Sequence, residues 1–249
     1  MQPYHLQLWD LFLMQLTNWR WSWSAVLVVG IASPVFLILL LGLFTPPDDA
    51  EALAHILTGN MVLSLLLDGL SKTSNHFIYM RTNGQLEYFA TLPIQRSALI
   101  LATVGAFLLL SLPSVITTLI LGGWLLNVEF ALHPLIMLVI PLIVLSLAGL
   151  GALIGLIGRT PDQVGSMALL ATLVLFGFGP VLVPASRLPD FMQTLSLLSP
   201  STYAASALRQ VVLGTDEATP LGVSLLVLAL FALGCLWGVT RLLDWRRQT

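Results

Sequence analysis

Apolar runs alternate with short polar segments along most of this 249-residue chain. An apolar run of about 20 residues folds as a helix long enough to cross the roughly 30 Å hydrocarbon core of a membrane. The pattern therefore predicts an all-α integral membrane protein that forms a single transmembrane domain, residues 1–249. Its six expected transmembrane helices cover residues 24–44, 52–70, 98–126, 134–157, 164–183 and 220–242.

The segment before the first span, residues 5–22, has a different pattern. Its apolar side chains recur at helical spacing with polar side chains between them, which is typical of an amphipathic helix at a membrane–water interface. The apolar positions are Leu6, Trp9, Leu13 and Leu16, and the polar ones are Gln7, Asp10, Gln15 and Asn18. We expect Trp19, Trp21 and Trp23 to form an aromatic belt where the chain enters the bilayer. Since residues 1–23 lack the pattern of a signal peptide, we expect them in the mature protein.

Basic residues lie at alternate ends of the apolar runs. Eight of the ten Lys and Arg residues fall on one side of the resulting topology. The positive-inside rule assigns that side, with both termini, to the cytoplasm, so we expect a multi-pass protein of the cytoplasmic (inner) membrane. The eight are Arg20, Lys72, Arg81, Arg96, Arg159, Arg241, Arg246 and Arg247, and the other two, Arg187 and Arg209, lie in the outer segment 184–219.

The composition excludes several classes of protein. The hydrophobic fraction is 57%, only 9% of the residues are charged, and the mean hydropathy is +0.93, all outside the range of soluble domains. No basic cluster is dense enough to follow a phosphate backbone, so a nucleic-acid partner is not expected. The single cysteine, Cys235, argues against a disulfide framework and a thiolate metal site.

Motifs of catalysis are absent from the sequence. There is no GxxxxGK[ST] phosphate loop, no HExxH or paired-cysteine zinc spacing and no GxSxG. We therefore expect no enzyme active centre, metal or cofactor on this chain. Asp68 and Lys72 are four residues apart, and we expect an ion pair there; the alternative is that Asp68 anchors or gates the inner loop. Because the spans hold no chain of buried acids and bases, proton-coupled antiport is not favoured.

Two segments resemble a known family. One is the inner-loop sequence RTNGQLEYFATLPI, residues 81–94, and the other is Arg187-Leu-Pro followed by LSLLSPSTYAA at 195–205 and Ala207-Leu-Arg209. Together with six spans and an amphipathic N-terminal helix, they resemble the membrane subunit of ABC-2-type (type V fold) ABC exporters. The resemblance covers essentially the whole chain.

The resemblance implies that the inner loop, residues 73–97, carries a coupling helix over residues 84–92 that docks into a separate ATPase subunit. Leu86, Phe89, Ala90 and Leu92 would fill an apolar cleft of that subunit, Arg81 and Glu87 would form charge pairs at its rim, and Pro93 would end the helix. Residues 5–22 would be the connecting helix of the family. The expected coupling residues are Arg81, Gly84, Leu86, Glu87, Phe89, Leu92 and Pro93.

The resemblance also implies that residues 184–219 form a re-entrant helical hairpin in the outer leaflet. Backbone at membrane depth must be buried in protein or face water, which a half-apolar segment with prolines can satisfy. The expected outer-gate residues are Arg187, Pro189, Pro200, Tyr203 and Arg209. The alternative for the two arginines is that they extend to lipid phosphates of the outer leaflet.

Family members work as two permease subunits, here a homodimer or heterodimer, above two ATPase subunits that hold ATP and Mg²⁺. The pathway would run between the permeases, lined by Asn60, Met61, Ser64, Met167, Thr172, Phe176 and Phe178. This mostly apolar set favours export of an amphipathic drug, a lipid or a lipid-linked glycan. A polysaccharide or lipooligosaccharide exporter of the same family is an alternative. From other classes, a six-span assembly factor or a secondary transporter without an ATPase remains open.

Overall fold

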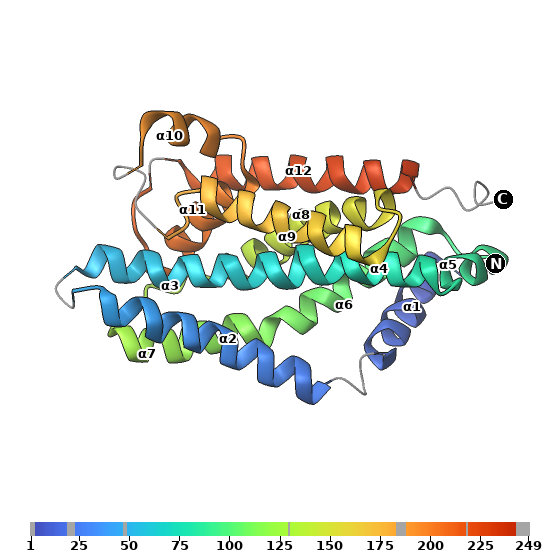
Figure 1. Ribbon diagram of the computed structural model, residues 1–249, viewed down its shortest axis with the longest axis horizontal. Helices are drawn as coiled ribbons and strands as arrows, with labels where there is room; N and C mark the ends of the chain where they lie inside the picture. The colour runs from blue at the N-terminus through green and yellow to red at the C-terminus, as the bar shows by residue number, and fades with distance from the viewer. Residues whose placement is uncertain are drawn as a thin grey trace.

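The computed structural model describes residues 3–18, 23–46, 49–128, 130–182, 188–217 and 219–242, and every regular element within these ranges is helical (Figure 1). The all-α prediction is confirmed for these ranges. The helices are α1 (Tyr4–Asn18), α2 (Trp23–Phe44), α3 (Ala50–Leu65), α4 (Lys72–Thr82), α5 (Gln85–Thr91), α6 (Arg96–Thr117), α7 (Gly123–Leu126), α8 (Ile136–Ile157), α9 (Pro161–Phe178), α10 (Asp190–Ser196), α11 (Pro200–Leu213) and α12 (Leu221–Leu242). Two π-helical segments, η2 (Leu66–Ser71) and η3 (Thr118–Gly122), join α3 to α4 and α6 to α7.

Within the described ranges, five helices are long and apolar enough to cross a membrane. They are Glu51–Thr82, Ser97–Leu126, Ile136–Ile157, Pro161–Phe178 and Leu221–Leu242. The first expected span, residues 24–44, corresponds to α2, in which Gly30–Phe44 forms a shorter apolar helix. The chain is therefore a multi-pass membrane protein.

The helix α8 lies at the centre of the packing, between η2 and α4 on one side and α11 and α12 on the other. Two glycines allow the close approach to η2 and α4, because small residues let membrane helices come together. A Cβ atom on Gly151 would lie 2.4 Å from the Leu70 carbonyl oxygen, and one on Gly155 would lie 2.5 Å from the Ser74 carbonyl oxygen. Gly151 and Gly155 thus form a contact surface of α8.

The helix α3–η2–α4 is continuous and reaches well past the length of a bilayer span. From Glu51 to Thr82 this helix has 32 residues and is about 48 Å long at the usual helical rise, against a hydrocarbon core of about 30 Å. Residues 73–82, which the sequence placed in the inner loop, continue this helix because Thr73, Ser74 and Phe77 are buried against its neighbours. In Figure 1 the helix runs from the end of the molecule near α10 and α11 to the opposite end, where α1 and α5 lie.

Candidate functional site

The short helix α5 begins and ends where its sequence requires. Gly84 has φ +70°, a left-handed conformation that glycine adopts without steric cost, and it turns the chain sharply after α4. At the other end Leu92 is extended, with ψ 146°, as expected for a residue that precedes proline. The helix therefore occupies Gln85–Thr91, with Gly84 and Leu92 as its caps, inside the expected coupling segment 84–92.

The side chains of α5 divide into an inward and an outward set. Phe89 is only 4% exposed and belongs to the main hydrophobic core of this chain, with Leu86 packed against that core. Glu87 and Leu92 are exposed, and so is Tyr88, at 62%. Phe89 therefore holds α5 to the body of the protein, whereas the resemblance had assigned it to a partner's cleft. Tyr88, which the sequence reasoning did not single out, is the large side chain that α5 presents outward.

Arg81 binds within the chain. Its Nη1 atom donates hydrogen bonds to the carbonyl oxygens of Leu156, at 3.1 Å, and Gly158, at 3.0 Å. These carbonyls lie at the C-terminal end of α8, where a helix leaves acceptors unpaired and its dipole favours a cation. Arg81 thus joins the end of α4 to the end of α8, in addition to any role at a partner's rim.

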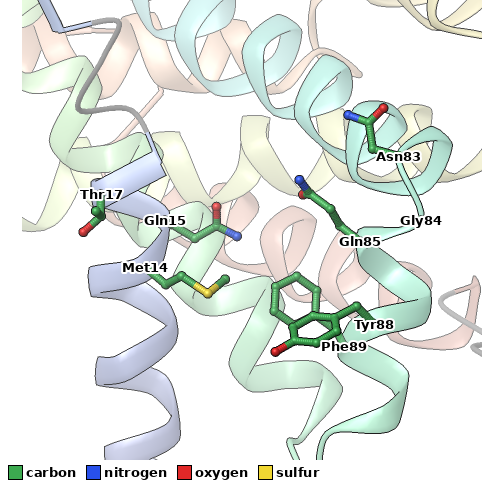
Figure 2. A pocket seen from close by; sticks show the side chains of 8 residues that line it. All are labelled: Met14, Gln15, Thr17, Asn83, Gly84, Gln85, Tyr88 and Phe89. Atoms are coloured by element: carbon green, nitrogen blue, oxygen red, sulfur yellow. The ribbon is translucent and has the colours of Figure 1, made fainter.

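A groove lies between α1 and α5 (Figure 2). It has a volume of about 550 Å³. Met14 and Gln15 of α1 point into it from one side, and Gln85 and Phe89 point into it from the other. The remaining lining residues are Thr17, Asn83, Gly84 and Tyr88.

The helix α1 is amphipathic, and its buried stripe contains two glutamines. Gln7, Leu11 and Gln15 are buried, whereas Leu6, Trp9 and Leu13 are exposed. Three of the four apolar side chains that the sequence placed at the membrane interface are thus exposed, and the fourth, Leu16, is half-buried. Of the expected aromatic belt, Trp19 and Trp21 lie outside the described residues, and the structure describes only the backbone of Trp23.

The expected pathway residues of α3 lie in the interior of this protomer. Met61 is fully buried, and the Asn60 amide donates a hydrogen bond to the carbonyl oxygen of Pro34 in α2, at 2.9 Å. The Ser64 hydroxyl donates to the Asn60 carbonyl oxygen, at 2.9 Å. Asn60 therefore joins α3 to α2, whereas Ser64 bonds within α3 itself.

The expected pathway residues of α9 are more varied. Thr172 is buried and shares a hydrogen bond with the Ser71 hydroxyl, at 3.1 Å. Met167 and Phe176 are partly buried against hydrophobic clusters, and Phe178 is half-buried. The large apolar side chains of α9 that are exposed are instead Leu169, Leu170, Leu173 and Val174.

Prolines start both outer helices of the expected gate. Pro189 caps the N-terminus of α10, and Pro200 is the first residue of α11, where its missing N–H costs no helical bond. The Tyr203 hydroxyl donates to the Leu197 carbonyl oxygen, at 2.9 Å, which closes the turn between the two helices. Arg187 lies outside the described residues.

Arg209 of α11 is a buried cation, 3% exposed. Its Nη1 atom lies 3.1 Å from Oε1 of Glu217, and its Nη2 atom donates to the Pro180 carbonyl oxygen. Burial lowers the pKa of the Arg209 guanidinium, and the Glu217 carboxylate opposes that shift. Because the guanidinium is paired inside the protein, the alternative in which Arg209 extends to lipid phosphates is wrong.

Sequence reasoning did not identify three residues that make hydrogen bonds in these sites. Gln7 and Gln15 looked like the water-facing side of an amphipathic helix, although their spacing with Leu11 marks one stripe. Glu217 lies eight residues after Arg209 and beyond the turn at Gly214, whose φ is +67°, and no local sequence pattern marks it as the partner of Arg209.

Comparison with known proteins gives the family. The family model of the ABC-2 type transporter membrane domain matches residues 7–213, from α1 to the end of α11. A search for similar curated proteins returned no match. The chain therefore belongs to the ABC-2 type transporter family and is a membrane permease of an ABC transporter.

Proposed function

We propose that this chain is the permease subunit of an ATP-driven exporter with six transmembrane helices, in which α2 supplies the first span. Two permeases would assemble with two ATPase subunits, which would hold ATP and Mg²⁺. Both termini would lie in the cytoplasm, as the alternation of basic residues supports. Family membership supports an ATPase partner and a dimer, since ABC-2 permeases generally have both.

The observation that carries the proposal is the helix α3–η2–α4 with α5 at its tip. A helix of about 48 Å would project beyond a hydrocarbon core of about 30 Å at the cytoplasmic end. There Gly84 reverses the chain, and α5 presents Glu87, Tyr88 and Leu92 outward. A partner bound to α5 would therefore act on one end of the continuous helix α3–η2–α4, whose other end would lie at the outer surface.

The outer segment, residues 184–219, would form the re-entrant hairpin above the pathway. Within it, the bond network of Arg209 joins α11 to Glu217 in the α11–α12 connection and to Pro180 after α9. We propose that this network holds the exit closed at rest. The pathway would form between two permeases near α3 and α9, and the exposed leucines of α9 suit either a second permease or lipid.

Co-purification tests the proposal. A tagged chain expressed in its native cells should retain a Walker-motif ATPase through mild detergent extraction, and Glu87→Arg should release it. Asp216→Arg, the same charge change at an exposed site near the outer end, should leave the ATPase bound. A chain that never retains an ATPase would support an assembly factor or a secondary transporter instead.

The cargo needs a separate measurement. We expect an amphipathic drug, a lipid or a lipid-linked glycan to stimulate ATP hydrolysis by the reconstituted complex in proteoliposomes. Stimulation by a long polysaccharide alone would favour the polysaccharide-exporter alternative.

A further inference from the structure

The helix α1 turns its two glutamines toward the protein. Gln7, Leu11 and Gln15 follow one another at a spacing of four residues, and they are 5%, 6% and 2% exposed. Polar side chains of an interfacial helix normally face water, and burying an amide is unfavourable unless it is hydrogen-bonded. The bonds that these two amides make therefore account for the orientation of α1.

Gln7 binds the connection between α5 and α6. Its Nε2 atom donates to the Pro93 carbonyl oxygen, at 3.4 Å, and its Oε1 atom accepts from the backbone N–H of Gln95, at 3.2 Å. Pro93 and Gln95 lie between the two helices, so the Pro93 carbonyl and the Gln95 N–H have no partner in a helical ladder. One side chain thus supplies both a donor and an acceptor to the segment through which α5 continues into α6.

Gln15 binds two turns further along α1. Its Nε2 atom donates to Oγ1 of Thr103 in α6, at 3.2 Å, and to Sδ of Met80 in α4, at 3.9 Å. The Thr103 hydroxyl in turn donates to the Leu99 carbonyl oxygen, at 2.8 Å. The helices before and after α5 therefore both contact this amide.

The two amides are separated by about 12 Å along the axis of α1. Apolar contacts alone have no preferred direction, so they would let α1 roll or slide on its neighbours. Hydrogen bonds need a defined distance and angle, so two of them at separate points fix both the rotation and the position of a helix.

We propose that Gln7 and Gln15 are positioning residues that lock α1, α4, α5 and the first half of α6 into one rigid body. The proposal rests on the proposed function, since such a body would transmit force from a partner on α5. It also implies that the exposed face of α1, Leu6, Trp9 and Leu13, moves with the coupling helix.

Distance measurements between spin labels test the proposal. Cys235→Ser removes the one native cysteine, and Asp10→Cys with Ala90→Cys places one label on the exposed face of α1 and one on α5. The distance between the two labels is measured by double electron–electron resonance on the permease in lipid nanodiscs without an ATPase. The result is therefore independent of whether an ATPase binds, which the co-purification decides.

The parent protein should give a single narrow distance distribution. The double variant Gln7→Met with Gln15→Met should add a second population at longer distance. The single variant Gln7→Glu keeps an oxygen that can accept the hydrogen bond from the Gln95 N–H. Its second population should therefore be smaller than that of the single variant Gln7→Met. Thr17→Val is the matched control, because among the described residues the exposed Thr17 hydroxyl bonds only to Leu13 of its own helix, and this variant should leave the distance distribution unchanged.

A second label pair separates positioning from general loosening. Met137→Cys and Trp237→Cys mark exposed sites on α8 and α12, and their distance distribution should stay the same in every glutamine variant. A broad distribution in the parent, an unchanged α1–α5 distribution in the double variant, or equal broadening at both label pairs would overturn the proposal.

Discussion

The two ends of this permease, one at α1 and α5 and the other at α10 and α11, are held together by different chemistry. At the end where α1 and α5 lie, proposed to be cytoplasmic, the neutral amides of Gln7 and Gln15 join α1 to the segments around α5. At the opposite end, proposed to be the outer one, the buried cation of Arg209 joins α11 to Glu217 and Pro180. A neutral hydrogen bond contributes about 1 kcal/mol, whereas removing one partner of a buried ion pair costs about 3–5 kcal/mol.

This difference suggests that the two ends have different mechanical roles. Several weak, directional bonds suit a part that moves as a unit and stays intact, while a buried ion pair suits a contact that is either fully made or fully broken. Breaking the Arg209 contact should therefore cost more stability than breaking the glutamine contacts.

Arg209→Met should have the largest effect on stability. It leaves the Glu217 carboxylate, whose side chain is 19% exposed, without its cation, and it should lower the free energy of unfolding by about 3–5 kcal/mol. Denaturation of the detergent-solubilised protein measures this. Arg159→Met, at an exposed arginine of the inner turn, is the control. Equal stability of the two variants would show that the outer bond network is not a strong contact.

Gly155→Ala tests how α4 is held to the centre of the molecule. The added Cβ would lie 2.5 Å from the Ser74 carbonyl oxygen, so α4 must shift away from α8, at a cost of about 1–3 kcal/mol. Gly234→Ala in α12 is the matched control, because its Cβ would meet nothing within 4 Å. If Gly155→Ala were as stable as Gly234→Ala, the close contact between α8 and α4 would not matter.

Gln15→Met should have a smaller effect. It removes the bond to Thr103, but the Thr103 hydroxyl keeps its bond to Leu99, so the loss should be about 1 kcal/mol. Gln85→Met, at an exposed glutamine of α5, should change the stability less. A cost for Gln15→Met as large as that for Arg209→Met would erase the contrast between the two ends.

Glu87→Arg should have the smallest effect on stability. Glu87 is exposed, and an exposed substitution usually changes the free energy of unfolding by no more than about 0.5 kcal/mol. Its expected loss of the ATPase would then be a loss of binding and not of folding. Thermal unfolding of the variant decides this, and a marked destabilisation would undermine the co-purification test.

Much of the fold follows from the apolar pattern. The expected spans coincide with α3, α6, α8, α9 and α12 in their central parts, because burial in lipid leaves a long apolar run in the sequence. The second span was ended too early, at residue 70, because Lys72 and Asn75 look like loop residues. The Asn75 amide, however, donates to the Ser71 carbonyl oxygen of its own helix, so its polarity does not end the helix.

The sites were harder to predict because their partners are distant in the sequence. Gln7 and Pro93 are 86 residues apart, and Arg209 and Pro180 are 29 apart. Nothing in the local pattern around Phe89 says that its ring faces its own core and that Tyr88 faces outward. The ends of α5 were predictable, because Gly84 and Pro93 restrict their own backbone and that of the neighbouring residue.

Site-specific photo-crosslinking at Tyr88 tests the central claim, that α5 is where an ATPase acts on this permease. p-Benzoylphenylalanine in place of Tyr88 should crosslink to a Walker-motif ATPase in native membranes, and the same group in place of Phe191, which is 59% exposed on α10 at the opposite end of the molecule, should not. An ATPase crosslink from Phe191 but not from Tyr88, or from neither position, would contradict the account.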